Sequence, residues 1–101
     1  MKSDETMKEY QFDRYRLFYV SGPSEYRAKI TVYNGSERVA MIMFTDYEIL
    51  PENKLDEFPM KIYYSIKDFS NIRIILEKEN PLSIYLYENL RTCEIGKRKL
   101  A

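Results

Sequence analysis

The chain has no histidine and no tryptophan, and it has a single cysteine, Cys93. Without histidine, it lacks the usual imidazole base, the Ser-His and Cys-His nucleophile pairs and the commonest zinc ligand. One cysteine cannot form an internal disulfide or a cysteine cluster, which favours a reducing compartment, so we expect a cytoplasmic protein. We also expect that the protein is not an enzyme and has no catalytic residues, no metal site and no cofactor.

Glycine is also scarce, with three residues among 101. None of them builds a G-x-G-x-x-G pattern or a P-loop, so no phosphate-binding loop of these kinds is expected. No apolar run reaches the roughly 18 residues that a membrane-spanning helix needs. Residues 1–9 carry five charged side chains and no apolar segment follows them, so we expect neither a signal peptide nor contact with a membrane.

The net charge is zero, because 16 Lys and Arg balance 16 Asp and Glu. With 45% apolar and 15% aromatic residues, the composition argues against an intrinsically disordered chain. A length of 101 residues suits one domain. We therefore expect a single domain over residues 1–101, with a flexible N-terminus at residues 1–9 and a basic tail at residues 97–101.

Residues 26–46 carry the clearest β-hairpin signal. Apolar and polar side chains alternate over residues 26–33, as in a strand with one buried face. The dipeptide Asn34-Gly35 follows, and both residues tolerate a positive φ, which makes it a strong signal for a two-residue turn. The next strand is expected over residues 36–45.

A two-residue loop also predicts the register of this hairpin. It places Ile30 opposite Val39, and it places Arg27 opposite Ile42 on the other face. In this register Ile42 and Phe44 lie on the less apolar face, where the neighbouring strand offers them little cover. The second strand is then apolar on both faces, which is typical of a central strand.

The rest of the chain predicts one helix and several more strands. Apolar side chains at helical spacing over residues 69–79 predict an amphipathic helix, with Asp68 or Ser70 as its cap. Pro81 ends it, because proline cannot continue the helical hydrogen bonds. An acidic loop with two prolines is expected at residues 47–59. Strand-like composition recurs in four further segments, residues 10–20, 60–66, 82–90 and 91–97.

These segments predict an α+β domain with the order β-β-β-β-α-β-β. The expected sheet is mostly antiparallel, has five to six strands and carries one amphipathic helix on one face. A helix of about three turns covers only part of such a sheet, so we expect the opposite face to be open or covered by a partner. A chain of this size buries only about 60–65% of its unfolded surface, so a homodimer would gain stability.

One run has a resemblance to a known family. The sequence Tyr-Tyr-Ser-Ile-Lys-Asp-Phe-Ser-Asn-Ile at residues 63–72 resembles the Tyr-Tyr-x-x-x-Asp-Phe-x-Asn-Ile segment of a family of small uncharacterised bacterial proteins. Leu76, Glu79 and Pro81 match the Leu-x-x-Glu-x-Pro run that follows in that family. The resemblance implies the order strand, helix, strand and a bacterial or phage origin. It implies no activity, because none is assigned to the family.

Tyrosine is unusually frequent, with ten residues in the chain. On predicted strand faces, tyrosines and basic residues suit a solvated β surface, a protein interface or a stacking platform for single-stranded nucleic acid. The residues that we expect to contact a partner are Arg27, Lys29, Tyr33, Ile42, Phe44, Tyr63, Tyr85 and Tyr87.

The leading hypothesis is a non-enzymatic binding module, expected to be a homodimer, that engages a protein partner through an open sheet face or an edge strand. The apolar pair Ile42 and Phe44 motivates it. The alternative is single-stranded nucleic-acid binding by the Tyr and Arg face, with residues 97–99 as a basic arm. The zero net charge disfavours this alternative, because phosphate binding normally requires a basic surface.

Overall fold

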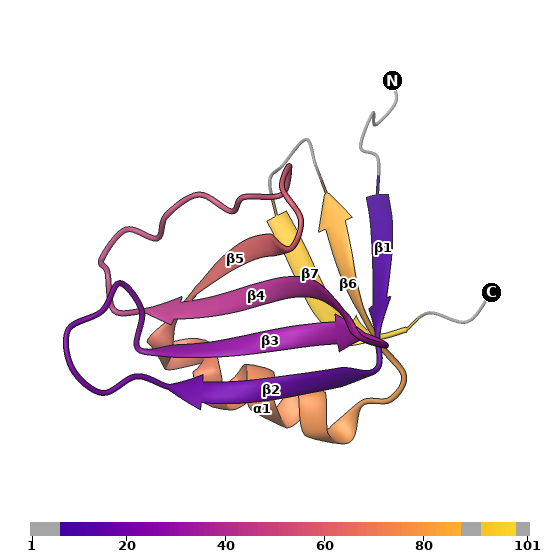
Figure 1. The fold of residues 1–101 in the computed structure, drawn as a ribbon, viewed down its shortest axis with the longest axis horizontal. Coiled ribbons are helices and arrows are strands. Elements are labelled where there is room, and N and C mark those ends of the chain that lie inside the picture. Colours follow the sequence, from indigo (N-terminus) through magenta and orange to yellow (C-terminus); the bar gives the residue numbers. More distant parts are fainter. Residues whose placement is uncertain (1–6, 88–91, 99–101) are drawn as a thin grey trace.

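The computed structural model describes residues 7–87 and 92–98. These residues form seven strands and one α-helix, which confirms the α+β class (Figure 1). In chain order, the elements are β1 (Met7–Phe12), β2 (Arg14–Tyr19), β3 (Ala28–Asn34), β4 (Glu37–Thr45), β5 (Met60–Ser65), the 3-10 turn η1 (Ile66–Asp68), α1 (Phe69–Lys78), β6 (Leu82–Tyr87) and β7 (Thr92–Lys97).

The strands form two sheets instead of the single sheet that the sequence predicted. Sheet A has the order β1-β6-β7 and is antiparallel. Sheet B has the order β2-β3-β4-β5, and its β4–β5 pair is parallel while its other pairs are antiparallel. The loop at residues 46–59 is long enough to return the chain to the start of a parallel strand. Five strands precede α1 rather than four.

The extra strand arises because residues 10–20 do not form one strand. Asp13 interrupts the run, so that Phe12 pairs within sheet A and Arg14 pairs within sheet B. An Asp13 carboxylate oxygen accepts the N–H of Gly35 at 3.2 Å, which links this corner to the turn between β3 and β4. The corner carries the chain from one layer of the fold to the other.

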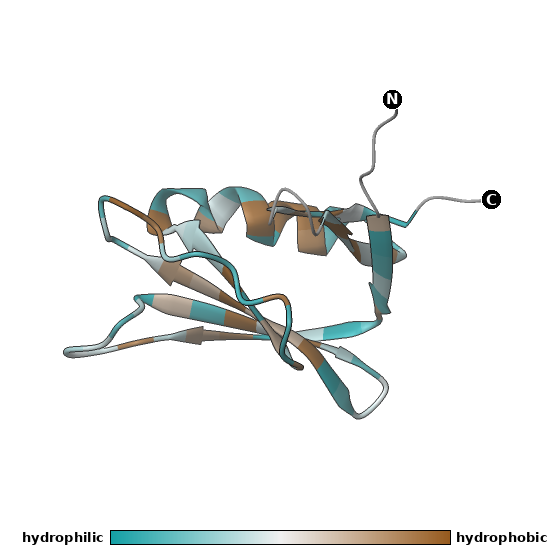
Figure 2. Ribbon diagram, turned by 90° about the horizontal axis from the view of Figure 1, so that it is seen from above, coloured by the Kyte–Doolittle hydropathy of each residue, from teal (hydrophilic) through white to brown (hydrophobic). Residues whose placement is uncertain are grey.

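The molecule has two layers, with sheet B on one side and α1 together with sheet A on the other (Figures 1 and 2). The apolar core lies between them. Phe44 of β4 meets Phe69 of α1 edge to face, with ring centroids 5.0 Å apart and an interplanar angle of 88°. The other buried members of this core are Phe12, Ala28, Ile30, Val32, Val39, Ala40, Ile42, Leu55, Met60, Ile62, Ile72, Leu76, Leu82, Ile84 and Leu86.

The predicted register of the β3–β4 hairpin is wrong. Ile30 lies opposite Ile42 and not opposite Val39, a shift of three residues. A shift by an odd number of residues moves every side chain of a strand to the other face. Ile42 and Phe44 therefore face the core, where each is 0% exposed.

Two local features cause this shift. Asn34 pairs with Glu37, so the loop consists of Gly35 and Ser36 rather than Asn34 and Gly35. Gly35 takes the positive φ of 63° that the turn requires and that glycine adopts without a Cβ penalty. A register shift after Val32 adds a β-bulge to the ladder.

The predicted helix is confirmed over residues 69–78. Phe69, Ile72 and Leu76 are its buried side chains, as the helical spacing indicated. Asp68 makes no side-chain cap hydrogen bond, and the Ser65 hydroxyl instead accepts the Lys67 N–H at 3.2 Å in the preceding turn.

The chain ends differ in part from expectation. Residues 7–9, which the sequence predicted to be part of a flexible N-terminus, belong to β1, and the prediction for residues 1–6 lies outside the described residues. In the basic tail, the Arg98 N–H donates to the Pro81 carbonyl at 2.7 Å, and its guanidinium donates to the Leu82 carbonyl at 3.2 Å. Arg98 is therefore held against the fold. The predictions for residues 88–91 and 99–101 also lie outside the described residues.

Candidate binding surface

Sheet B has one face that α1 does not cover, which we call the outer face; Figure 1 is viewed from this side, with α1 behind the sheet. Since side chains alternate between the two faces of a strand, the residues next to the buried ones belong to the outer face. Across the strands, Phe18 lies beside Lys29, and Lys29 lies beside Met43. The charged and aromatic members of the outer face are Arg14, Arg16, Phe18, Lys29, Tyr33, Arg38, Lys61 and Tyr63.

The outer face is basic although the whole chain is neutral. Five of its side chains are Arg or Lys, and none of its positions within β2 to β5 carries a carboxylate. In the loop at residues 46–59, the Glu57 carboxylate approaches this face, and its Oε1 lies 3.8 Å from the Lys61 Nζ. Both side chains are partly exposed, so solvent weakens this pair. The outer face therefore has a local excess of positive charge although the net charge of the chain is zero.

Cations and aromatic rings alternate on this face and contact each other. The Arg14 guanidinium carbon lies 4.8 Å from the centroid of the Tyr33 ring, and the Lys29 Nζ lies 5.1 Å from that of Phe18. The Arg16 guanidinium carbon lies 5.7 Å from the same Phe18 ring. Cation–π contacts of this kind hold long basic side chains close to the sheet and reduce their freedom.

The β5 edge of sheet B is covered by the chain itself. Lys54 and Lys61 exchange two backbone hydrogen bonds, at 2.8 and 3.0 Å. The Tyr63 N–H donates to the Asn53 side-chain oxygen at 2.8 Å. These contacts fix the position of Tyr63 on the outer face, where its side chain is half-buried.

Three of the predicted partner-binding residues, Lys29, Tyr33 and Tyr63, lie together on the outer face. Arg27 precedes β3, and its guanidinium donates to the Gly22 carbonyl at 3.0 Å, so it stabilises the β2–β3 loop. Ile42 and Phe44 were predicted to contact a partner, and this prediction is wrong because both are buried in the core.

The remaining two predicted residues lie in the other layer. Tyr85 is 4% exposed and its hydroxyl donates to the Lys97 carbonyl at 3.1 Å. The Tyr87 hydroxyl donates to Glu94 Oε1 at 3.0 Å. Because both belong to β6 of sheet A, they do not extend the surface that Lys29 forms, and the predicted set is not one surface.

The predicted set of partner-binding residues omits five members of the outer face. Arg14, Arg16 and Phe18 lie on β2, Arg38 lies on β4 opposite Tyr33 of β3, and Lys61 lies on β5. The signal for the first three was present, because these positions alternate along the chain. This pattern was not used because residues 10–20 were interpreted as one strand and the corner at Asp13 was not recognised.

Two partly buried groups, the Cys93 thiol and the Tyr64 hydroxyl, keep their protons at neutral pH. Burial raises the pKa of the Cys93 thiol to about 11 and that of the Tyr64 hydroxyl to about 12. Both groups keep their protons at pH 7, so neither supplies an ionised nucleophile.

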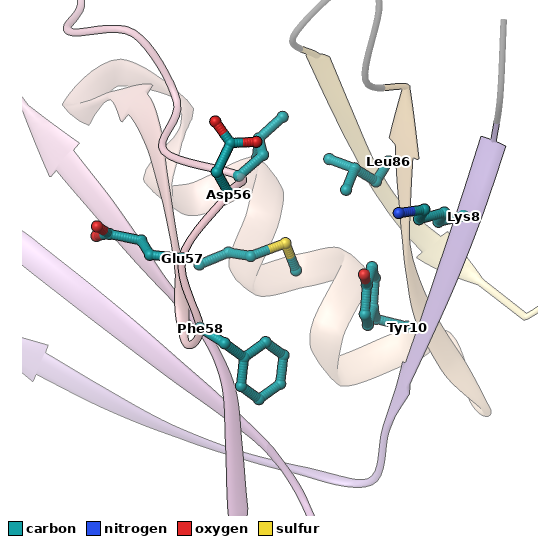
Figure 3. A pocket seen from close by; sticks show the side chains of 8 residues that line it. Lys8, Tyr10, Asp56, Glu57, Phe58 and Leu86 are labelled. Atoms are coloured by element: carbon teal, nitrogen blue, oxygen red, sulfur yellow. The ribbon is translucent and has the colours of Figure 1, made fainter.

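A separate hollow of about 340 Å³ lies between β1 and the loop that precedes β5 (Figure 3). Leu55, Met60 and Leu86 are its buried walls. Lys8 from β1 and Asp56 from the loop line it with opposite charges. Its mixed charge and its place between the two sheets distinguish it from the basic outer face.

The comparisons with known proteins give no further guidance. No protein-family model, no curated protein and no solved structure matches this chain. The resemblance at residues 63–72 therefore stays a prediction. Within residues 7–87 and 92–98, no cluster of three or more His, Cys, Asp or Glu side chains is placed to hold a metal ion. The helix of this described part is neither long nor apolar enough to cross a membrane.

Proposed function

We propose that this protein is a non-enzymatic binding module whose outer face of sheet B binds single-stranded nucleic acid in the cytoplasm. One observation carries the proposal: five cations and three aromatic rings occupy one sheet face on which the described strands place no carboxylate. Proteins that bind single strands combine a basic track for the phosphates with rings on which bases stack.

The electrostatic argument concerns this face rather than the whole chain. Phosphate contacts by Lys and Arg release counterions, and this release drives binding. A neutral protein that collects its acidic residues elsewhere can still present a basic surface of this kind. The net charge that disfavoured nucleic acid is therefore a poor guide to this protein.

The aromatic residues favour a single strand over a duplex. Phe18, Tyr33 and Tyr63 lie on three different strands, and neighbouring strands are about 4.8 Å apart. The bases of a flexible single strand can adjust to such rings, whereas the bases of a duplex are already stacked and paired. Each base that stacks on a ring contributes about 1–3 kcal/mol.

A protein partner is the second candidate. The pair that first motivated it, Ile42 and Phe44, is buried, but the edge strand β2 exposes Leu17 and Tyr19. An acidic polypeptide would also neutralise the five cations of the outer face. It would leave the aromatic rings without bases to stack on, which separates the two candidates by experiment.

The test compares a charge change on the outer face with the same change elsewhere. We expect the protein to raise the fluorescence anisotropy of a labelled oligothymidine at low salt. The double variant Arg16→Ala with Lys29→Ala should bind at least about tenfold more weakly, because two phosphate contacts are lost. The control Arg73→Ala with Lys78→Ala removes the same charge from α1 and should bind like the wild type. Equal weakening of both doubles would contradict a site on the outer face, and equal binding of a polyglutamate competitor would favour the protein partner.

A further inference from the structure

β2 is the open edge of sheet B. It lies at the end of the strand order, and no other described segment pairs with the side of β2 that points away from β3. The opposite edge, β5, is covered by the exchange of hydrogen bonds between Lys54 and Lys61. An uncovered edge strand is a template for pairing with another strand.

The direction of the backbone N–H and C=O groups shows which residues of β2 can form hydrogen bonds at the open edge. The Val20 N–H, just after β2, donates to the Arg27 carbonyl at 2.9 Å, so it points toward the chain of β3. The direction of the N–H and C=O groups alternates along a strand. Phe18 therefore directs its backbone groups toward β3, while Leu17 and Tyr19 direct theirs toward the open edge.

The side chains of this edge are unusually apolar for an exposed strand. Leu17 and Phe18 are each 40% exposed, and Tyr19 is 72% exposed. Natural edge strands are usually protected by charges, proline or a bulge. Here the protection is limited to Arg14 and Arg16, whose charges lie on the outer face.

A second copy of the chain fits this edge, and the backbone limits how it can pair. Hydrogen bonds between two edge strands join residues whose backbone groups both point toward the open edge. In β2 these residues are Tyr15, Leu17 and Tyr19, so they pair only among themselves. Pairing Tyr15 with Leu17 of the second copy would place Arg16 directly opposite Arg16 of that copy, which is destabilising. Pairing Leu17 with Tyr19 of the second copy would overlap the strands over fewer residues.

The register with Leu17 opposite Leu17 gives a long overlap, residues 15–19 of each copy, and keeps the two Arg16 side chains from lying opposite each other. We propose that β2 of two copies pair antiparallel with Leu17 opposite Leu17, so that two B sheets become one sheet of eight strands. Arg16 then lies opposite Phe18 of the second copy, which repeats the cation–π contact that these two residues already make within one chain. On the inner face, Tyr15 lies opposite Tyr19 of the second copy.

This inference goes beyond the proposed function and does not depend on it. The pairing would make the two outer faces continuous, but the dimer forms without nucleic acid. A short strand-to-strand contact is at the small end of specific interfaces, so we expect a dissociation constant in the micromolar range.

Cross-linking tests the register directly. In a Cys93→Ser background, Leu17→Cys brings two thiols to positions whose Cα atoms are about 5.5 Å apart, within the range of a disulfide. Phe18→Cys is the matched control, because its two copies lie on a diagonal about 7–8 Å apart, beyond that range. We expect a covalent dimer from the first variant under mild oxidation and little from the second. Equal cross-linking of the two variants would overturn the register.

Sedimentation equilibrium tests the dimer itself. The wild type should change from monomer to dimer over micromolar concentrations. Leu17→Lys should remain a monomer because two like charges would meet, whereas Leu17→Gln, of similar length and uncharged, should still dimerise more than the lysine variant. A wild type that stays monomeric up to about 1 mM, or a lysine variant that dimerises like the wild type, would overturn the proposal. Oligonucleotide binding by the Leu17→Lys variant, measured separately, tests the proposed function on its own.

Discussion

Arg14 and Tyr33 form the contact that joins β2 to β3 at the corner of the fold. The Arg14 guanidinium lies over the Tyr33 ring, and one of its nitrogens donates to the Gly35 carbonyl at 2.7 Å. We expect Arg14→Lys to lower the free energy of unfolding by about 1 kcal/mol, because lysine keeps the charge but not the planar fork of donors. Urea unfolding measures this. Arg16→Lys is the control and should change the value by less than about 0.5 kcal/mol; an equal loss in both variants would mean that the Gly35 contact has no effect on stability.

The place of Phe44 beneath α1 gives a second prediction. Phe44→Ala should lower the free energy of unfolding by about 3–5 kcal/mol, because it leaves a cavity beside Phe69. Phe18→Ala removes the same side chain from a site that is 40% exposed, and it should cost far less. Denaturant unfolding of the two variants measures both losses in the free energy of unfolding. Similar costs would indicate that Phe44 is not in the core and that the register of the hairpin differs from the one described.

The aromatic residues of the outer face give a third prediction. Tyr63→Leu should weaken oligothymidine binding by a factor of about five or more, because one stacked base contributes about 1–3 kcal/mol. Tyr87→Leu makes the same change in sheet A and should leave binding unaltered. Fluorescence anisotropy titrations measure both. If Tyr63→Leu binds like the wild type, charge alone accounts for the affinity and the stacking part of the proposal is wrong.

The partly buried Cys93 and Tyr64 give a fourth prediction, on alkaline stability. In the unfolded chain the thiol loses its proton near pH 9 and the phenol near pH 10, whereas burial raises the folded pKa values to about 11 and about 12. The unfolded state then binds fewer protons than the folded state, so the contribution of these two groups to stability is constant below about pH 8 and falls as the pH rises toward 12. Thermal melts between pH 8 and 11 measure this.

Tyr64→Phe provides the control for the alkaline melts. It removes the group that ionises, so its stability should fall less steeply above pH 10 than that of the wild type. Parallel curves for the two proteins would show that Tyr64 ionises alike in the folded and unfolded chains, against the raised pKa.

Some of the fold follows from the sequence because the signals are local. The helix at residues 69–78 was predicted because three buried side chains recur at its own period and Pro81 limits its end. The strands at residues 60–65 and 92–97 were predicted from similar local signals. The residues that determine each of these elements lie within it or a few residues away.

The two errors that mattered depend on distant contacts. Whether the loop is Asn34-Gly35 or Gly35-Ser36 is a choice between two acceptable turns, and Asp13, 22 residues away, bonds to Gly35 in the turn that forms. The same Asp13 divides residues 10–20 between two sheets. The choice of turn shifts the register by two residues, which keeps the faces, and the bulge after Val32 adds one more. Because the total shift is odd, it moved Phe44 from the predicted surface into the core and left the basic face to other residues.

The salt dependence of oligonucleotide binding tests the central claim most directly. For a single strand, the logarithm of the association constant falls with the logarithm of salt by about 0.7 for each phosphate contacted. Three to five contacts by the cations of the outer face predict a slope of about −2 to −3.5 for oligothymidine. The Arg16→Ala, Lys29→Ala double variant should reduce this slope by about 1.4, since two contacts are lost. No binding by the wild type at low salt, or a slope that the double variant leaves unchanged, would contradict the account.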